Sequence, residues 1–257
     1  MSDLNGKISL VTGASSGIGQ ATAIQLAQKG SDLLLHYHSN EAGIQQTIEK
    51  LQQTGTNYDV FQCDFLDSVN LGNFCDKVWN QRGRIDLVVN NAGGDVLTTE
   101  KKNWTFEQKL EFLWNLDVQS TLAISRNLGT RMKSEPRQPK PLIVNIGWDQ
   151  APLGQAGESG QIFSTTKGAI MSFTKSLAKT LAPEVRVNCV APGWIKTSWG
   201  DTTSEYWDQR ARKESLLQRW GNANDVAQTI CFLASDEAEF INGQIVEVNG
   251  GLGFGSE

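Results

Sequence analysis

Val11-Thr12-Gly13-Ala14-Ser15-Ser16-Gly17-Ile18-Gly19 is the stretch that decides the fold. A β-type run from Lys7 to Val11 precedes its glycines, and a helical pattern from Gln20 to Lys29 follows them. Glycine allows a tight turn and lets a phosphate approach the backbone where a Cβ would collide. The N–H groups at the start of the helix then favour the negative charge of a pyrophosphate. The stretch therefore predicts a dinucleotide site, spaced G-x-x-x-G-x-G rather than the commoner G-x-G-x-x-G.

Strands and helices alternate along the rest of the chain, and no linker or repeat divides it. The predicted strands are 7–11, 32–37, 58–63, 85–90, 142–146, 185–190 and 244–248, and the predicted helices are 20–29, 41–53, 68–81, 106–132, 163–181 and 225–233. Strands that are apolar on both faces are typical of a parallel sheet with helices on each side. We therefore expect one α/β domain over 1–257, with a doubly wound parallel sheet. The polar, Trp-rich segment 194–220 is expected as a substrate-lid insertion over the site, where loops 90–94 and 147–160 converge.

Composition argues against several classes of partner. A net charge of −5 gives no reason to expect nucleic acid or a membrane surface. No apolar run approaches the roughly 18 residues that a membrane span needs, and Met1 to Ser9 lacks the pattern of a secretory signal. The four cysteines are scattered, and His36 and His38 are the only histidines, so no metal site is predicted. We expect a cytoplasmic protein with reduced cysteines.

Several motifs, taken in their order and spacing, resemble those of the classical short-chain dehydrogenase/reductase family over essentially the whole chain. They are Thr12 to Gly19, Asn90-Asn91-Ala92-Gly93, Pro192-Gly193 with Thr197 four residues on, and Asn249-Gly250-Gly251. The resemblance implies a Rossmann-type fold, a nicotinamide cofactor, a small-molecule substrate and a homodimer or homotetramer.

The same resemblance implies the cofactor contacts. Asn91 to Gly93 would border the adenine ribose, Asp64 would flank the adenine, and Ile195 and Thr197 would lie near the nicotinamide carboxamide. The full expected set is Gly13, Ser15, Ser16, Gly17, Ile18, Gly19, His38, Ser39, Asn40, Asp64, Asn91, Ala92, Gly93, Lys167, Pro192, Gly193, Ile195 and Thr197.

The choice between NADP and NAD depends on the end of the second predicted strand. NAD sites place an acidic residue there, which repels a 2′-phosphate. Here Tyr37 stands where the acid would be, followed by His38, Ser39 and Asn40, which can bond a phosphate. His38 adds positive charge when protonated. Neither this stretch nor the Ala14-Ser15-Ser16 turn contains arginine or lysine. The sequence favours NADP and leaves NAD open.

Catalysis in the family depends on an asparagine, a serine, a tyrosine and a lysine. The tyrosine exchanges a proton with the substrate, and the lysine grips the nicotinamide ribose and lowers the phenol pKa. The serine orients the carbonyl, and the asparagine holds a water that links the lysine to solvent. Here Asn115 fits the asparagine and Lys167 the lysine, but Phe163 stands at the tyrosine position and Trp148 at the serine position. The resemblance thus implies an atypical active site.

The missing phenol leaves three hypotheses. Another group donates the proton: Asp149 lies next to the lost serine, and the pteridine-reductase branch of the family places an aspartate near there, while Tyr206 lies in the insertion. In the second hypothesis the substrate needs no strong acid, and water donates the proton. In the third hypothesis the protein binds nucleotide without turnover, as a sensor or partner subunit. Tyr37 and Tyr58 lie in cofactor-side strands and are poor donors. Retention of Lys167 favours a bound cofactor in every case.

Aromatic residues suggest the substrate. The resemblance places Trp148, Trp194, Trp199 and Trp207 around the nicotinamide, with Trp104, Trp114 and Trp220 as further candidates. Such faces suit a flat or apolar substrate. A planar heterocycle such as a pterin, or an enone, agrees with both the aromatic wall and the missing phenol.

The helices 106–132 and 163–181 correspond to the dimer-forming pair of relatives, with apolar faces made of Leu110, Leu113, Leu116, Ile170, Phe173 and Leu177.

Overall fold

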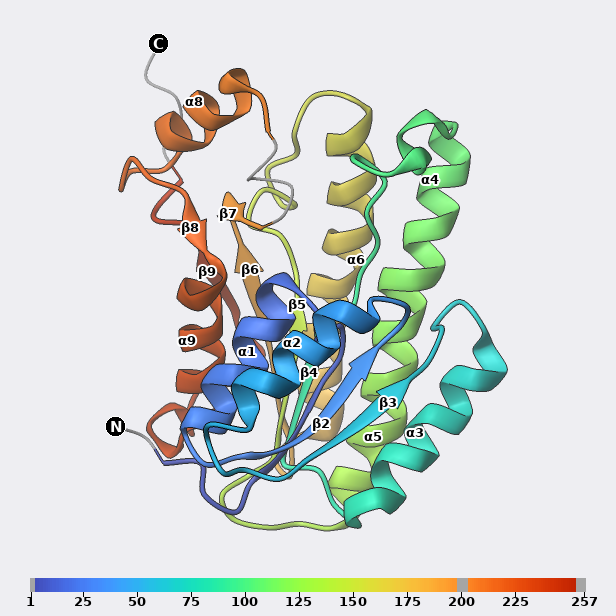
Figure 1. Cartoon of the computed structure of the whole chain (residues 1–257), viewed down its shortest axis with the longest axis vertical. Helices are drawn as coiled ribbons and strands as arrows, with labels where there is room; N and C mark the ends of the chain where they lie inside the picture. The colour runs from blue at the N-terminus through green and yellow to red at the C-terminus, as the bar shows by residue number, and fades with distance from the viewer. Residues whose placement is uncertain (1–2, 198–202, 253–257) are drawn as a thin grey trace.

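The computed structural model describes residues 3–197 and 203–252, and within them a parallel sheet of seven strands forms the central layer (Figure 1). The strand order is β3-β2-β1-β4-β5-β6-β9. The chain begins in the middle, moves outward to β3 and then crosses back to β4, so the order reverses beside β1. Ligands of such sheets bind outside the carboxyl ends of the strands at this reversal. The predicted doubly wound α/β fold is confirmed.

The strands form where the sequence is apolar in short runs. Their bounds are β1 (Ile8–Val11), β2 (Asp32–Tyr37), β3 (Tyr58–Gln62), β4 (Leu87–Asn90), β5 (Leu142–Ile146), β6 (Arg186–Pro192) and β9 (Ile245–Val248). All residues of β4, β5 and β6 are buried because helices cover both faces of the sheet. In the register, Val11 lies opposite Leu35 and Val89, and Asn90 lies opposite Asn145. The carboxyl ends of the central strands therefore finish close together.

Helices cover the sheet in two layers. One layer is made of α1 (Gly17–Gln28), α2 (Glu41–Leu51) and α9 (Ala223–Ala234), and the other of α3 (Ser68–Arg82), α5 (Ser120–Ser134) and α6 (Glu158–Leu181). Each layer packs its own apolar cluster on the strands: Leu26 and Ile230 belong to the first, and Phe74, Leu128 and Leu177 to the second. No helix among the described residues is both long and apolar enough to cross a membrane.

The prediction of one unbroken helix over 106–132 needs correction. The structure divides it into α4 (Phe106–Leu113), a π-helical segment η2 (Trp114–Gln119) and α5. A π turn inserts an extra residue without any proline or glycine to signal it, and such turns are frequent at functional sites. Here the inserted turn carries Asp117, which is buried. The turn brings this carboxylate to the end of β4, where it accepts from Gly94 N at 2.9 Å.

Several other boundaries differ from the sequence prediction, and two of these differences bear on the site. α6 begins at Glu158, five residues before the predicted 163, so the expected loop 147–160 is shorter. Gly160 lies in the first turn of this helix, where only glycine fits, because a Cβ would meet Gln155 O at 2.2 Å. The strand predicted over 185–190 also continues to Pro192 as β6. This continuation places the start of the lid segment directly at the carboxyl edge of the sheet.

Helix α8 (Glu205–Glu214), in the second half of the segment 194–220, lies above that edge (Figure 1). The segment is tied down by a short two-stranded sheet, in which β7 (Ile195–Lys196) pairs with β8 (Gly221–Asn222). Trp199, expected near the nicotinamide, lies outside the described residues.

Candidate functional site

The glycine turn joins β1 to α1 and leaves the helix start open. Gly13 and Gly17 have φ of +66° and +52°, conformations that favour glycine. Ser16, the N-cap of α1, makes no side-chain bond to the helix N–H groups. A Cβ on Gly19 would lie 2.1 Å from Gly13 O and 2.4 Å from Asn91 Nδ2. Gly19 therefore lets α1 start against the β4 loop, with its N–H groups directed at an anion.

Hydrogen bonds fix this turn to the neighbouring strands. Thr12 Oγ1 accepts from Asn91 N at 2.9 Å and from Ala92 N at 3.0 Å. Asn91 Nδ2 donates back to Thr12 O at 3.0 Å. From β2, His36 Nδ1 accepts from Gly13 N at 3.2 Å, while its Nε2 lies 3.0 Å from Cys63 O. His36 was assigned only to a strand by the sequence, because its role depends on contacts between distant segments.

His36 is held neutral by its surroundings. Its ring is buried and stacks on Phe65, with ring centroids 3.9 Å apart. Burial lowers the pKa of His36 from 6.5 to about 4. A neutral imidazole that donates from Nε2 keeps its Nδ1 lone pair for the Gly13 amide. Protonation of this histidine would therefore remove the acceptor that holds the glycine turn.

A cavity of about 450 Å³ opens over the turn. Most of the expected cofactor residues line it: Gly13, Ser15, Ser16, Gly17, Ile18, His38, Ser39, Asn40, Asp64, Asn91, Ala92, Gly93 and Thr197. His38 Nε2 lies 3.8 Å from Asp64 Oδ2, so the end of β2 and the end of β3 meet across this cavity. Tyr37, placed at the acid position by the sequence, is absent from the lining, and His38 takes that place.

A second cavity, of about 520 Å³, continues from the first under α8. The two share Ile18 and Thr197 in their walls, so together they can hold an extended ligand. The other expected cofactor residues in this wall are Lys167, Pro192, Gly193 and Ile195.

Aromatic rings dominate the second cavity. Trp148 and Phe163 lie side by side there, with ring centroids 6.3 Å apart at 67°. Trp194, Trp207 and Trp220 also line it, and the Trp194 ring packs against the other two. Trp104 instead packs on Phe112, and Trp114 is exposed on the π segment; neither lines the cavity. Phe163, Trp148 and Lys167 thus line the same cavity.

Helix α8 closes the cavity through a cluster of polar and aromatic contacts. Trp194 Nε1 donates to Glu214 Oε2 at 2.8 Å, and Arg210 Nε pairs with Glu214 Oε1 at 2.6 Å. The Arg210 guanidinium lies 5.2 Å from the ring centroid of Trp207 and 5.7 Å from that of Trp194. With its amide oxygen turned toward α8, Gln155 accepts from Arg210 at 2.8 Å. Helix α8 is thus bonded to Trp194 and to the loop that carries Gln155.

Lys167 makes an ion pair that the sequence did not indicate. Its Nζ lies 2.9 Å from Asp117 Oδ2, and Asp117 has only 2% of its side chain exposed. Asn115, expected beside the lysine, instead accepts from Gln119 Nε2 at 2.8 Å along the same π segment. Asp117 lies two residues further on. The spacing of the motif does not reveal this pair, because it joins the π segment to a helix fifty residues further along the chain.

Asp149 lies behind the cavity rather than in its wall. It is 1% exposed, its Oδ2 accepts from Asn249 Nδ2 at 3.1 Å, and a Cβ on Gly193 would meet that oxygen at 2.9 Å. Burial raises its pKa from 3.8 to about 6. Tyr206 is also outside the wall: 64% of it is exposed, and its ring packs on Trp207. Neither group suggested by the sequence as a proton donor faces the cavity.

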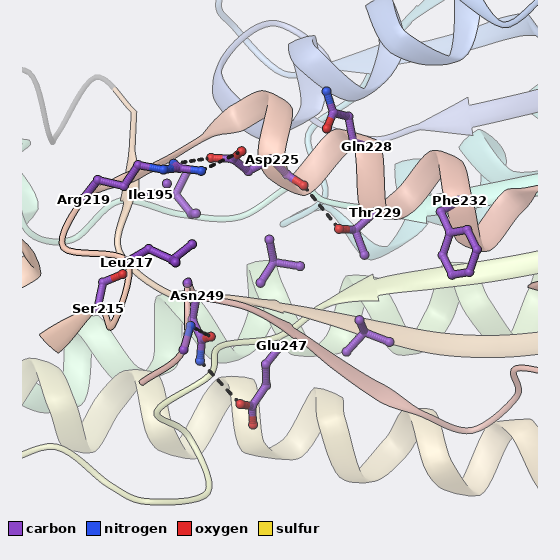
Figure 2. Close-up of a pocket in the computed structure, with 15 residues that line it drawn as sticks. Ile195, Ser215, Leu217, Arg219, Asp225, Gln228, Thr229, Phe232, Glu247 and Asn249 are labelled. Carbon is purple, nitrogen blue, oxygen red and sulfur yellow. Dashed lines mark hydrogen bonds and ion pairs between the residues drawn. The ribbon is translucent and has the colours of Figure 1, made fainter. Parts of the chain in front are cut away.

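Asn249 leads to a third cavity, of about 540 Å³, between α9 and β9. Figure 2 shows Asn249 directed toward Glu247, and Arg219 paired with Asp225 on α9 at 2.8 Å. Ile195 is the one expected cofactor residue in its wall. We assign it no part in the predicted site.

The two buried titratable groups predict opposing effects of pH on stability. As pH falls below 6.5, the unfolded chain takes up a proton at His36 before the folded chain does, which lowers the free energy of unfolding. As pH falls through 6 toward 3.8, the folded chain takes up a proton at Asp149 before the unfolded chain does. This uptake raises the free energy of unfolding. Asp149→Asn removes only the second effect. Between pH 7.5 and 4.5, denaturant unfolding should show that the free energy of unfolding falls by about 2 kcal/mol more in the variant than in the wild type.

An exposed carboxylate serves as the control for this prediction. Glu237 lies on the surface, and Glu237→Gln should leave the pH dependence of unfolding unchanged. Parallel curves for wild type and Asp149→Asn would show that the buried carboxyl does not titrate differently in the folded chain.

Comparison with known proteins assigns the family. Residues 13–253 match the family model described as Enoyl-(Acyl carrier protein) reductase. The chain belongs to the classical short-chain dehydrogenase/reductase family. Among short-chain reductases, 3-oxoacyl-[acyl-carrier-protein] reductase FabG of Aquifex aeolicus is 34% identical over 253 residues, 97% of this chain and 98% of its own length. Tropinone reductase-like 3 of Erythroxylum coca is 31% identical over 248 residues, 96% of this chain and 93% of its own.

A solved short-chain dehydrogenase shares the fold, and its own structure contains NADP. The enzyme from Burkholderia cenocepacia J2315, in complex with NADP, is 29% identical, with a TM-score of 0.84 over 96% of this chain and 98% of its own. This chain is thus an oxidoreductase of the short-chain family, whose relatives include an NADP-binding structure. The residues here fit a dinucleotide: glycines at positive φ, an uncapped helix start and a lysine on the continuing cavity wall.

Proposed function

We propose that the protein is an NADP-dependent short-chain reductase of a flat, conjugated small molecule such as an enone or a pterin-like heterocycle. The observation that carries this proposal is the pair formed by Phe163 and Trp148 in the wall beside Lys167. Where relatives have a phenol and a hydroxyl, this wall offers two apolar rings. A plain ketone must gain a proton on a developing alkoxide and so depends most on a donor, whose contribution is roughly 10² to 10⁴-fold.

A conjugated acceptor suits the same wall. Reduction of a conjugated C=C or C=N bond need not place full charge on one oxygen, so it depends less on the missing phenol. The rings of Trp148, Trp194, Trp207 and Trp220 provide faces on which a planar molecule stacks. The family model's own description, an enoyl reductase, concerns reduction of such a double bond.

The residues have distinct proposed parts. When bound, the nicotinamide would supply the hydride. The amides at the start of α1 would hold the pyrophosphate, and Asp64 and Asn91 would border the adenosine. Lys167 would hold the nicotinamide ribose. His38, Ser39 and Asn40 would accept the 2′-phosphate, since no carboxylate at the end of β2 repels it.

The assembly and location follow the family by analogy. We propose a cytoplasmic homodimer or homotetramer. Part of the apolar face expected to form the dimer packs within this chain, since Leu113, Ile170 and Leu177 are buried there. Leu110, Leu116 and Phe173 are half-buried against the same clusters.

A turnover screen tests the proposed function. Purified protein with NADPH or NADH is offered enones, quinones, pterins and plain ketones, and oxidation of the cofactor is followed by absorbance. We expect turnover with at least one planar conjugated class, a higher kcat/KM with NADPH, and the slowest rates with plain ketones. Saturable cofactor binding without turnover in any class would favour the alternative, a non-catalytic nucleotide-binding homologue that acts as a sensor or partner subunit.

A further inference from the structure

We propose that the ammonium group of Lys167 is the proton donor of this site, and that Asp117 is the residue that positions it. This inference rests on the proposed function, because it concerns the proton that a reduced substrate must gain. In this proposal the ammonium of Lys167 takes the part of the tyrosine phenol of relatives. In those relatives the matching lysine binds the cofactor.

The first argument is the composition of the cavity wall. Among the described residues that line the second cavity, Lys167 is the only ionisable side chain. Ser159, Gln155 and Thr197 also line it, and they offer neutral hydrogen-bonding groups rather than an acid. Phe163 carries no exchangeable proton. A protein acid acting on a ligand in this cavity therefore has to be Lys167, within the part of the chain that the structure describes.

The second argument is the way in which the lysine is held. An ammonium has three N–H donors. One is directed at Asp117 Oδ2, 2.9 Å away, and 15% of the Lys167 side chain remains exposed at the wall. Asp117 is itself fixed, because its Oδ1 accepts from Gly94 N at 2.9 Å at the end of β4. The carboxylate thus anchors Nζ from inside and leaves its other donors for the ligand.

The third argument is the charge around the lysine. Asp117, on the π segment, is the carboxylate that faces Nζ. From β6, Cys189 faces the same lysine, but burial raises the pKa of its thiol to about 12 and so leaves it neutral. Among the residues that the structure describes, Asp117 is thus the carboxylate that pairs with the ammonium. It compensates for the cost of holding a charge in a mostly buried position.

The proton transfer follows from these contacts. As the substrate accepts a hydride from a reduced nicotinamide cofactor, negative charge develops on its oxygen or nitrogen. One N–H bond of Lys167 breaks, its electron pair stays on Nζ, and the proton forms a new O–H or N–H bond on the substrate. A neutral amine remains beside the Asp117 carboxylate. A proton from solvent then restores the ammonium.

The central experiment uses Lys167→Ala and Lys167→Arg at saturating cofactor, with the planar substrate that the wild type reduces. We expect kcat to fall by about 10²-fold or more in both, because the alanine has no proton and a guanidinium does not release one. Ethylammonium should restore at least a tenth of the lost kcat to Lys167→Ala. Tetramethylammonium, which has the charge but no N–H, should not. The matched control is Lys109→Ala, which removes a lysine paired with Glu158 at 2.7 Å outside the cavity.

A second readout needs no turnover. In cofactor-free protein labelled with ¹³C at the lysine ε-carbons, the signal lost in Lys167→Arg should move in Asp117→Asn, whereas the Lys109 signal should stay. Asp117→Asn should also lower kcat about tenfold while the Kd for the cofactor changes less than threefold. A lower kcat with a nearly unchanged Kd would show that Asp117 positions the donor, because general damage to the fold would weaken cofactor binding as well.

The outcomes distinguish the two proposals. Wild-type turnover combined with unimpaired kcat in Lys167→Arg, or equal rescue by both ammonium ions, would overturn the donor role and leave the proposed function standing. Lack of any wild-type turnover would remove the proposed function and the donor role with it. An unmoved Lys167 signal in Asp117→Asn would overturn the positioning role alone.

Discussion

Phe163→Tyr combined with Asp117→Asn should make the protein a reductase of plain ketones, with kcat/KM raised about 10² to 10⁴-fold over the wild type. The phenol would stand four residues before Lys167 on α6, at the position relatives use. Phe163→Tyr alone should gain much less. The Asp117 carboxylate, 2.9 Å from Nζ, offsets the positive charge that lowers the phenol pKa in the family.

The same substitution of Asp117 should therefore act in opposite directions in the two backgrounds. With Phe163 present, Asp117→Asn loosens the proposed donor and lowers conjugated-substrate reduction. With Phe163→Tyr, it frees the lysine charge and raises ketone reduction. A double-mutant cycle on kcat/KM for both substrates measures this coupling. Phe232→Tyr, an exposed position on α9, is the control and should change neither rate. Equal gains from the single and double variants would show that Asp117 does not offset the lysine charge.

Gly19→Ala is expected to weaken cofactor binding strongly and to destabilise the fold. Its Cβ would lie 2.1 Å from Gly13 O and 2.4 Å from Asn91 Nδ2, so α1 must move away from the β4 loop. Overpacking of this kind costs roughly 1 to 3 kcal/mol. The shift also displaces the amides that would hold the pyrophosphate, and we expect the Kd for NADPH to rise at least about a hundredfold, or about 2.7 kcal/mol. Fluorescence titration and denaturant unfolding measure the two effects.

Gly72 is the matched control for this prediction. It is also a helical glycine, in α3, and a Cβ there meets nothing within 4 Å. Gly72→Ala should leave cofactor binding unchanged and stabilise the fold by about 0.5 to 1 kcal/mol, because alanine is the better helix former. Similar behaviour of the two variants would contradict the close packing assigned to Gly19.

Local patterns in the sequence were sufficient to predict the fold. The glycine turn and the apolar runs of β1, β4 and β5 determine element type without reference to distant residues. They predicted a doubly wound sheet, which the structure confirms. The π turn at Trp114–Gln119 was not predictable in this way, since no glycine or proline signals it. The pairing of Asp117 on this segment with Lys167 could only be found in three dimensions.

In the candidate site, too, some positions could be predicted from local spacing, and others depend on contacts between distant residues. Positions that depend on spacing along one helix, Phe163 and Lys167 above all, fall together in one cavity wall. His36 and Asp117 act through residues more than twenty positions away, Gly13 and Gly94 respectively, so no local motif marks them. Asp149 is the opposite case. Its neighbours in sequence suggested a donor, but its packing against Asn249 directs it away from the cavity.

The central claim, that a nicotinamide dinucleotide spans both cavities with its ring against the tryptophan wall, is tested most directly by titration with NADPH under tryptophan excitation. Trp148, Trp194, Trp207 and Trp220 line the cavity that would hold the nicotinamide. We predict quenching of tryptophan emission and sensitised nicotinamide emission, saturating at about one NADPH per chain and absent in Gly19→Ala. Failure to take up either NADPH or NADH, or uptake without energy transfer from tryptophan, would contradict the account.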